Sequence, residues 1–221
     1  MSEIVMIQQA VMAEDEKYAL RVRESMKEKK ILAVNLIGSP GCGKTTLLEA
    51  TASRADFSFA VIEGDLETSR DAQRLAAANI ETLQINTKGF CHLEAHVIEK
   101  ALSSLNIDAV DVLFIENVGN LVCPAEFDLG EDFKVAVSST PEGADKPLKY
   151  PMLFAQAEAV LLTKTDLLPY VRFDKELFLQ DVRSLNPGCP IIELDLLSGA
   201  GIEKWVSFLS ERLREKRAHA A

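Results

Sequence analysis

Apolar and polar positions alternate along the chain in two different rhythms. Short apolar runs, several of them rich in valine and isoleucine, are typical of buried parallel strands. Longer segments in which apolar residues recur every three or four positions are typical of amphipathic helices. The short runs occupy residues 31–37, 59–63, 81–86, 111–117, 133–139, 159–165 and 190–195, and the longer segments occupy residues 91–105, 174–185 and 201–216. Their alternation predicts an α/β fold, a mainly parallel sheet with helices on both faces.

The first thirty residues differ from this pattern. From Lys17 to about Lys30 the chain is rich in glutamate, lysine and arginine, which predicts a helix that either packs on the domain or is exposed to dock a partner. The apolar residues of this helix are Leu20, Val22 and Met26. A chain of 221 residues that is 48% hydrophobic suits one domain of ordinary size. We therefore expect a helical extension over residues 1–30 and a single domain over residues 31–221.

Charge and cysteine content narrow the class of protein. The formal net charge is -10, whereas proteins that bind nucleic acids or anionic membrane surfaces display a basic face. The chain has no apolar stretch long enough to span a bilayer and no leader pattern, so we expect a cytoplasmic protein that binds neither nucleic acid nor membrane. Its cysteines are too few and scattered for a disulfide framework and should be thiols. They are Cys42, Cys91, Cys123 and Cys189.

The most specific motif follows the first predicted strand. Residues 38–46 read GSPGCGKTT, which matches G-x-x-x-x-G-K-[ST] between a predicted strand and a predicted helix, as a phosphate-binding loop requires. In such a loop the backbone N–H groups bind phosphates, Lys44 reaches the outer phosphates and the Thr45 hydroxyl binds Mg²⁺. A glycine-rich turn without a ligand is the alternative. The predicted nucleotide-binding residues of the loop are Gly38, Gly41, Cys42, Gly43, Lys44, Thr45 and Thr46, with Cys42 contributing only its backbone.

A second motif, TKTD at residues 163–166, follows a predicted strand. Guanine presents two donors, N1–H and the exocyclic amine, that one carboxylate can accept, whereas adenine leaves a buried carboxylate unpaired. Asp166 in this position therefore predicts guanine, and the Lys164 stem would lie over the base and the phosphate-binding loop. A solvated lysine and aspartate in an ordinary loop are the alternative. With the phosphate-binding loop, the motif favours GTP and GDP as the nucleotides.

Acidic residues stand at the ends of two predicted strands. Glu63 and Asp65 end one strand, Glu116 ends another, and such hard oxygen ligands suit Mg²⁺. Asp65 or Glu116 would coordinate Mg²⁺ or position the attacking water, and the sequence does not divide these roles. Each carboxylate has a plainer interpretation as a helix cap or a surface acid. Gly64 and Gly119, beside these acids, would let the backbone move with the γ-phosphate.

The motifs together resemble one family. GSPGCGKTT, EGDLET, GFCHLEAH, ENVGNLVCP, GADKPLKYP and TKTD are similar to motifs of HypB, the nickel-incorporation GTPases of [NiFe]-hydrogenase maturation in the SIMIBI class of P-loop proteins. The likeness runs from about Ile31 to Gly201. It implies GTP hydrolysis, a homodimer that depends on GTP or metal, and nickel handling between subunits. It also implies two partners, a HypA-type nickel metallochaperone and a hydrogenase large-subunit precursor.

The resemblance also implies a metal site. It places Cys91, His92 and Cys123 together at a dimer interface, where thiolates and imidazole would suit Ni²⁺ or Zn²⁺. Cys91 and His92 are adjacent, so they can share a metal only at irregular backbone or a helix start. Small buried cysteines and a polar helix-start histidine are the plain alternative. His96, four residues after His92, would share its helical face and make a variant site, or be merely exposed.

Other interpretations remain open from the sequence. Urease-maturation GTPases have a related fold and task, but their corresponding strand tip follows an E-S-G-G pattern, unlike ENVGN here. A small-molecule P-loop kinase and a non-enzymatic metal-binding module are less favoured. Cys189, in a proline-bounded turn, is expected to be structural. Lys146 and Lys149 either reach the nucleotide across a dimer or lie in a solvated loop. The first thirty residues contain neither cysteine nor histidine, so no N-terminal nickel store is expected, and without an evident arginine finger we expect slow turnover.

Overall fold

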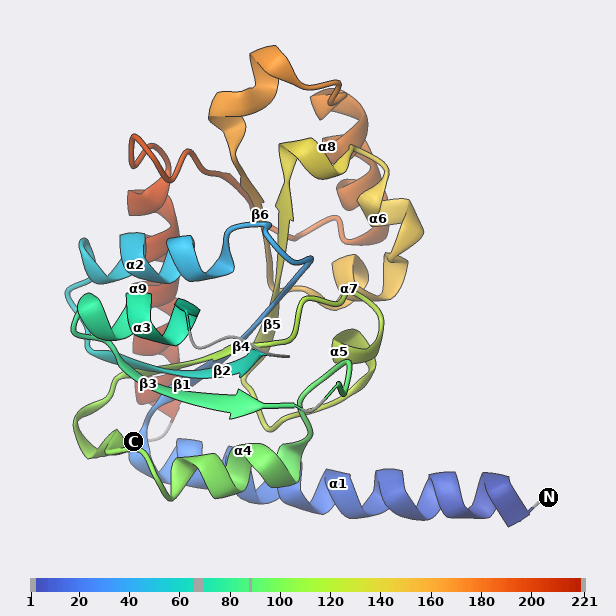
Figure 1. Cartoon of the computed structure of the whole chain (residues 1–221), viewed down its shortest axis with the longest axis vertical. Helices are drawn as coiled ribbons and strands as arrows, with labels where there is room; N and C mark the ends of the chain where they lie inside the picture. Colours follow the sequence, from blue (N-terminus) through green and yellow to red (C-terminus); the bar gives the residue numbers. More distant parts are fainter. Residues whose placement is uncertain (1–2, 66–69, 88, 220–221) are drawn as a thin grey trace.

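A parallel sheet forms the centre of the molecule. The computed structural model describes the backbone of residues 3–65, 70–87 and 89–219, and the side chains of residues 14–64, 72–87 and 89–219. Within these residues seven strands form one parallel sheet in the order β3-β2-β4-β1-β5-β6-β7 (Figure 1). The strands are β1 (Leu32–Gly38), β2 (Phe59–Asp65), β3 (Glu81–Asn86), β4 (Val112–Glu116), β5 (Phe133–Ser139), β6 (Ala159–Thr163) and β7 (Ile191–Glu193). The expected α/β architecture is confirmed.

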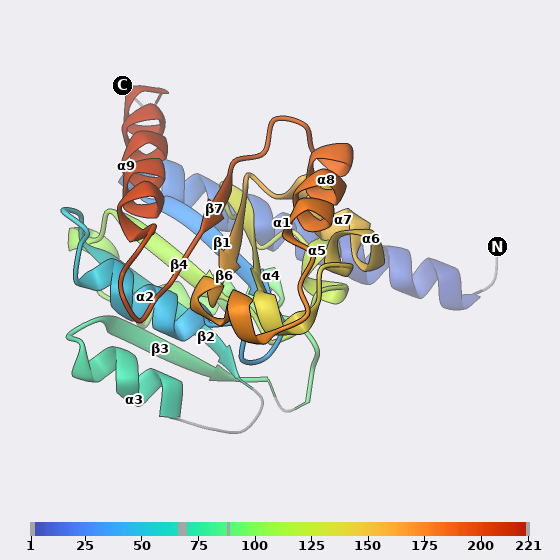
Figure 2. The same cartoon turned by 90° about the horizontal axis from the view of Figure 1, so that it is seen from above.

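Helices connect the strands and cover both faces of the sheet. The α-helices are α1 (Glu3–Lys29), α2 (Lys44–Ala52), α3 (Arg70–Ala77), α4 (Ala95–Leu102), α5 (Cys123–Glu126), α6 (Lys146–Lys149), α7 (Pro151–Gln156), α8 (Lys175–Leu185) and α9 (Ile202–His219). Short 3₁₀ segments are η1 (Ile107–Ala109), η2 (Thr140–Glu142) and η3 (Thr165–Tyr170). Figure 2 shows α2 and α9 on one side of the central strands and α5 to α8 on the other.

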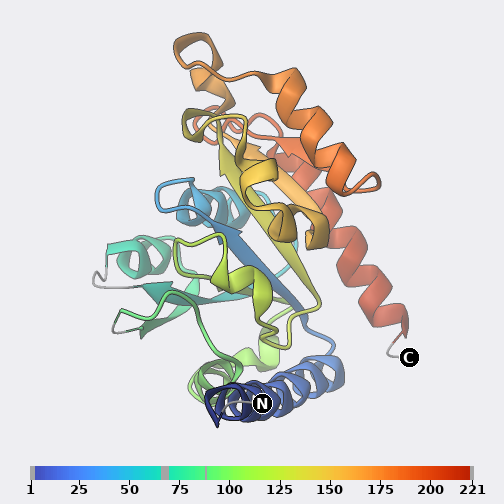
Figure 3. The same cartoon turned by 90° about the vertical axis from the view of Figure 1, so that its right-hand side faces the viewer.

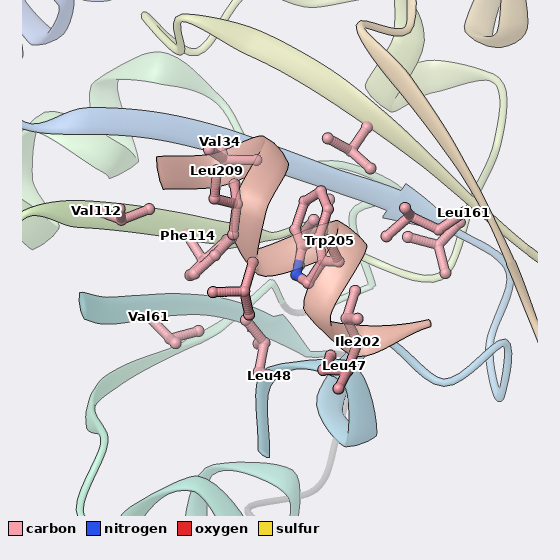
Figure 4. Packing of buried hydrophobic residues seen from close by; sticks show 14 of the residues in the cluster. Val34, Leu47, Leu48, Val61, Val112, Phe114, Leu161, Ile202, Trp205 and Leu209 are labelled. Carbon is pink, nitrogen blue, oxygen red and sulfur yellow. The ribbon is translucent and has the colours of Figure 1, made fainter. Parts of the chain in front are cut away.

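Successive residues of each central strand face opposite layers, so a strand buried on both faces is apolar at most positions. In β1, Val34 and Leu36 pack under α2 and α9, whereas Ala33 faces α1 and α4. The first layer centres on Trp205, which is fully buried against Phe114 and the sheet (Figure 4). The indole N–H of Trp205 donates to Thr51 Oγ1 at 3.1 Å, so its only polar atom is satisfied.

The opposite face has two patches of core. Helices α1 and α4 lie side by side and cover the β2 and β4 end of the sheet (Figures 1 and 3). Helices α5, α7 and α8 cover the β5 and β6 end, where Phe154 and Phe178 meet edge to face. Among the helices in the described residues, none combines the length and the apolarity needed to cross a membrane.

One helix agrees with the sequence expectation and another differs from it. Helix α1 covers almost all of the helical extension expected over residues 1–30, and its N-terminal part extends beyond the sheet (Figure 1). Within it Val22 and Met26 are buried, but Leu20 is exposed, because it lies on the opposite side of the helix. Helix α4 begins at Ala95 rather than Cys91, so the residues before Ala95 are free to use their backbone groups elsewhere.

Candidate functional site

The phosphate-binding loop has the strand–loop–helix form that its motif predicts. Strand β1 ends at Gly38, and α2 begins at Lys44 directly after Gly43. Gly43 has φ of 103°, a left-handed conformation that is strained for any residue with a Cβ. Lys44 Nζ donates to the Gly38 carbonyl at 3.2 Å, which holds the ammonium group over the loop. The N-terminus of α2 and the loop N–H groups thus face the same space as the lysine.

A cavity of about 440 Å³ opens above this loop. It brings together most of the predicted nucleotide-site residues, because parallel strands end at one edge of the sheet. The predicted residues that line it are Gly41, Gly43, Lys44, Thr45, Thr46, Glu116, Gly64, Gly119 and Lys164. Glu63, Arg74 and Asn117 line it as well, although the sequence analysis assigned no role to Arg74 or Asn117. The size suits a nucleotide's phosphates and sugar with a metal ion.

The acidic strand tips meet the loop through Thr45. The Thr45 hydroxyl donates a hydrogen bond to Glu116 Oε1 at 3.1 Å, and both side chains are buried. Glu63 is the register partner of Glu116 on β2 and is buried as well, so two carboxylates lie side by side at the end of neighbouring strands. The Asp65 backbone ends β2, but its side chain lies outside the described residues. Its predicted role therefore stays a prediction.

The second motif is attached to the loop from the other side. Thr163 Oγ1 donates to the Cys42 carbonyl at 2.5 Å, and Lys164 Nζ donates to the Gly41 carbonyl at 2.6 Å. Lys164 thus crosses the phosphate-binding loop, in the geometry expected for its stem. Asp166 is half-buried in the first turn of η3 and is not among the residues that line the cavity. Its contact with a guanine base stays a prediction.

Cys42 and Gly38 form the buried floor of the loop. The Cys42 side chain is fully buried, as expected, and burial raises the pKa of its thiol to about 11. A Cβ at Gly38 would lie 2.6 Å from Cys42 Sγ, so the thiol fills the space that only glycine leaves. Cys42 is therefore a packing residue, and its N–H donates to the Ser39 carbonyl at 3.2 Å. Neither Cys42 nor Gly38 is among the residues that line the cavity, so their predicted nucleotide contacts stay predictions.

The three predicted transition-metal ligands lie together. Cys91 Sγ is 3.1 Å from Cys123 Sγ and 3.5 Å from His92 Nδ1, and the three ligand atoms all lie within 4.8 Å of one another. Cys91 and His92 stand in irregular backbone before α4, and Cys123 begins α5. The His92 ring stacks on Phe127 with ring centroids 4.0 Å apart, which fixes its plane. Two sulfurs and one imidazole nitrogen suit a borderline-soft divalent ion.

At neutral pH the imidazole of His92 can ligate a metal as it stands, whereas the cysteine thiols must first lose their protons. Burial lowers the pKa of His92, against the opposing charges of Glu94, Asp15 and Glu126, so its ring is neutral at pH 7. The pKa of Cys91 is raised, chiefly because its thiol donates to the Cys123 sulfur. A metal ion that binds here must therefore displace protons from sulfur but not from His92.

The remaining candidates lie away from this group. His96 is on α4 whereas His92 precedes it, so the shared helical face was wrong; His96 Nδ1 instead faces Glu94 Oε2 at 3.1 Å. Lys146 Nζ lies 3.3 Å from Ser39 Oγ, so it reaches the phosphate-binding loop of its own chain. Lys149 pairs with Asp145 on the surface. Cys189 is half-buried with its pKa raised to about 11 by burial, in agreement with a structural role.

Sequence reasoning missed two polar residues of the cavity. Arg74 on α3 donates to Thr46 Oγ1 at 3.2 Å and pairs with Glu49, so a cation stands beside the phosphate-binding loop. Asn117 follows β4 and is fully buried. Its side chain accepts hydrogen bonds from Val118 N, beside the cavity, and from Leu93 N, next to the metal-ligand candidate His92. Asn117 lies within the motif ENVGNLVCP, which was considered for its acid and its cysteine but not for this amide. Arg74 gave no sequence signal, because its helix is brought to the loop by the fold.

Comparison with known proteins agrees with this geometry. Residues 32–193 match the model of the CobW/HypB/UreG nucleotide-binding domain. The hydrogenase maturation factor HypB of Escherichia coli K12 is 49% identical over 201 residues, which cover 90% of this chain and 69% of that protein. The chain belongs to the HypB family. A HypB relative from Azotobacter chroococcum is 44% identical, over 99% of this chain and 72% of that protein.

Solved HypB structures have the same fold. The crystal structure of HypB from Helicobacter pylori in complex with nickel has a TM-score of 0.88 and 39% identity, and the match covers 91% of this chain and 96% of that one. HypB from Archaeoglobus fulgidus has a TM-score of 0.85 and 38% identity over 91% and 99% of the two chains. The signal recognition particle 54 kDa protein of Aeropyrum pernix, at 14% identity and a TM-score of 0.53, shares only the fold.

Proposed function

We propose that this chain is a Mg²⁺-dependent GTPase that binds nickel and promotes its insertion into a [NiFe]-hydrogenase precursor. It would act as a homodimer and receive nickel from a HypA-type metallochaperone. The observation that carries the proposal is the position of the metal group, the cluster formed by Cys91, His92 and Cys123. Cys123 lies on the loop that leaves Glu116 and Gly119, which line the nucleotide cavity, so one segment of chain connects the two sites. Family membership supports hydrogenase maturation as the task.

The nucleotide half of the proposal rests on the cavity. Lys44 and the N-terminus of α2 would bind the phosphates, and Lys164 would cover the loop from the base side. Thr45 and Glu116 are joined by a hydrogen bond and are buried, which supports them as the two protein groups around Mg²⁺. A bound Mg²⁺ would neutralise charge on the transferring phosphoryl group. Arg74 adds a further cation beside the loop.

The metal half of the proposal rests on ligand chemistry. The H. pylori relative was solved in complex with nickel, and this chain offers two thiols and one imidazole within 4.8 Å. Three protein ligands leave at least one coordination position open for transfer or for a second chain. Phe90 is 65% exposed and Val122 50% exposed, and each precedes a ligand cysteine. Apolar side chains exposed beside ligands support an interface between two copies at this face.

Urease maturation is the second candidate. The relative from Helicobacter hepaticus, 41% identical over 94% of this chain, is described as a hydrogenase/urease maturation factor. The same is said of the relative from Helicobacter pylori, 39% identical over 96% of this chain.

Nickel transfer to a purified apo-hydrogenase large-subunit precursor tests the proposal. The chain is loaded anaerobically with radioactive nickel, mixed with the precursor, and supplied with Mg²⁺ and GTP, GDP or ATP. We expect phosphate release from GTP and nickel in the precursor, with transfer lost in Cys91→Ser and kept in the matched control Cys189→Ser. Transfer that is equal with GDP and GTP, or that survives Cys91→Ser, would contradict the proposal. An apo-urease acceptor in parallel tests the second candidate.

A further inference from the structure

One buried amide oxygen connects the two sites. Asn117 Oδ1 accepts a hydrogen bond from Leu93 N at 3.3 Å and another from Val118 N at 3.0 Å. Leu93 directly follows the metal-group residue His92, and Val118 lines the nucleotide cavity. Asn117 as a whole residue is 1% exposed, so water does not compete for these bonds. A displacement of either backbone segment therefore acts on the same acceptor.

Both connected segments are packed against the nucleotide cavity. A Cβ at Gly64 would lie 2.9 Å from Leu93 Cγ, so the leucine side chain rests directly on a strand that lines the cavity. A Cβ at Gly119 would lie 2.5 Å from Pro40 Cγ, so the loop after Val118 rests on the phosphate-binding loop. These glycines allow close packing, which leaves little room for either segment to move alone.

The orientation of the Asn117 amide is fixed by a buried chain of polar groups. Asn117 Nδ2 donates to Asn35 Oδ1 at 3.3 Å, and Asn35 Nδ2 donates to Glu131 Oε1 at 3.1 Å. Glu131 Oε2 accepts from Leu129 N at 2.7 Å. Backbone N–H groups at one end can only donate, and the carboxylate at the other end accepts, so both amides have a single orientation that satisfies every bond. The oxygen of Asn117 must therefore face Leu93 and Val118.

We propose that Asn117 is a positioning residue that couples the nucleotide site to the nickel site, with Asn35 and Glu131 holding its amide in the coupling orientation. The inference rests on the proposed function, since it needs both ligands. When the γ-phosphate moves the Val118–Gly119 backbone, the shared oxygen moves the backbone at Leu93 and with it the His92 and Cys91 ligands. Coupling of this kind is reciprocal, so nickel changes nucleotide affinity by the same factor.

The test compares nickel affinity with GDP and with a non-hydrolysable GTP analogue under anaerobic conditions. In the unaltered chain we expect the two dissociation constants to differ by at least about fivefold. In Asn117→Ala the ratio should fall below about twofold. Asn186→Ala is the matched control, because it removes another amide that is bonded to backbone carbonyls, at the end of α8, and it should keep the full ratio.

The outcomes separate the two proposals. A preserved ratio of the two nickel dissociation constants in Asn117→Ala would overturn the inference and leave the proposed function intact. Equal nickel dissociation constants with GDP and with the GTP analogue in the unaltered chain would contradict both the inference and the proposed function. Hydrogen exchange on the unaltered chain gives a test that needs no variant. We expect the GTP analogue to change exchange at Leu93 and nickel to change exchange at Val118. If each ligand changes only its own segment, Asn117 does not couple them.

Discussion

Nickel binding should release about two protons per chain near pH 7.5. Cysteine thiols are ordinarily protonated at neutral pH, and the pKa of Cys91 is raised further by the hydrogen bond to Cys123. Only the thiolate ligates a metal, so each of the two cysteines must lose its proton. His92 contributes none, because burial lowers its pKa and its ring is already neutral. The proton count therefore follows from the ligand set.

This count sets the pH dependence of affinity. Two protons released per ion mean that the association constant rises about 100-fold per pH unit, or about 2.7 kcal/mol of binding free energy. Affinity should rise with pH over the range in which both thiols are protonated. A histidine with an ordinary pKa would release a third proton on nickel binding below about pH 6.5. Because the pKa of His92 is lowered, this third proton is released only in more acidic solution. The slope should therefore stay near two through pH 6.5.

Calorimetry in two buffers of different ionisation enthalpy measures the proton count at fixed pH. His92→Ala should leave the count near two while weakening binding, whereas Cys91→Ser should abolish the binding heat and the proton release together. One ion shared between two chains would release about four protons per ion, so the ratio of protons to nickel also reports on sharing. A count near zero in the unaltered chain, or one unchanged by Cys91→Ser, would refute thiolate ligation at this group.

Three further outcomes follow from single contacts. Asp166→Asn should weaken GTP binding by about 100-fold or more and improve binding of xanthosine triphosphate, and unchanged GTP affinity by calorimetry would rule out the carboxylate as base reader. Glu116→Gln should lower kcat for GTP hydrolysis by about 100-fold while nucleotide still binds, since the buried partner of Thr45 loses its charge; a wild-type rate would exclude a metal role. Thr51→Val leaves the buried Trp205 N–H unpaired and should cost about 2 kcal/mol, seen as a fall in Tm of about 4–8 °C, and an unchanged Tm would show that this bond adds no net stability.

The central strands were predictable because they are buried on both faces. Residues 133–139 became β5 with the expected bounds, since a central parallel strand is largely apolar. The edge strand β3 also has its expected bounds, residues 81–86, although it is only partly buried and its apolar and polar residues alternate. Helix α1 fills the helical extension expected over residues 1–30, but the charged segment that indicated a helix begins only at Lys17. Its first part extends beyond the sheet, where no core imposes a periodic apolar pattern on the sequence. Exposed helix is therefore the part of this fold that periodicity cannot delimit.

The candidate site was predictable where its residues are local in sequence. The phosphate-binding loop is one continuous motif, and its geometry follows from Gly43 and Lys44. Helix α4 was predicted to begin at Cys91, but the backbone there is held by Asn117 and by Asn120, whose Nδ2 donates to the Cys91 carbonyl at 3.2 Å. Arg74 reaches the cavity from another helix. Contacts between distant segments leave no local pattern, so these features needed the structure.

An anaerobic nickel titration with GDP and with a non-hydrolysable GTP analogue, with molecular mass followed by light scattering, tests the central claim most directly. The unaltered chain is compared with Cys91→Ser and Cys123→Ser. We expect nickel binding that depends on the nucleotide, is lost in both variants, and accompanies a change from one chain to two. Nickel binding that ignores the nucleotide and survives both substitutions would contradict the claim.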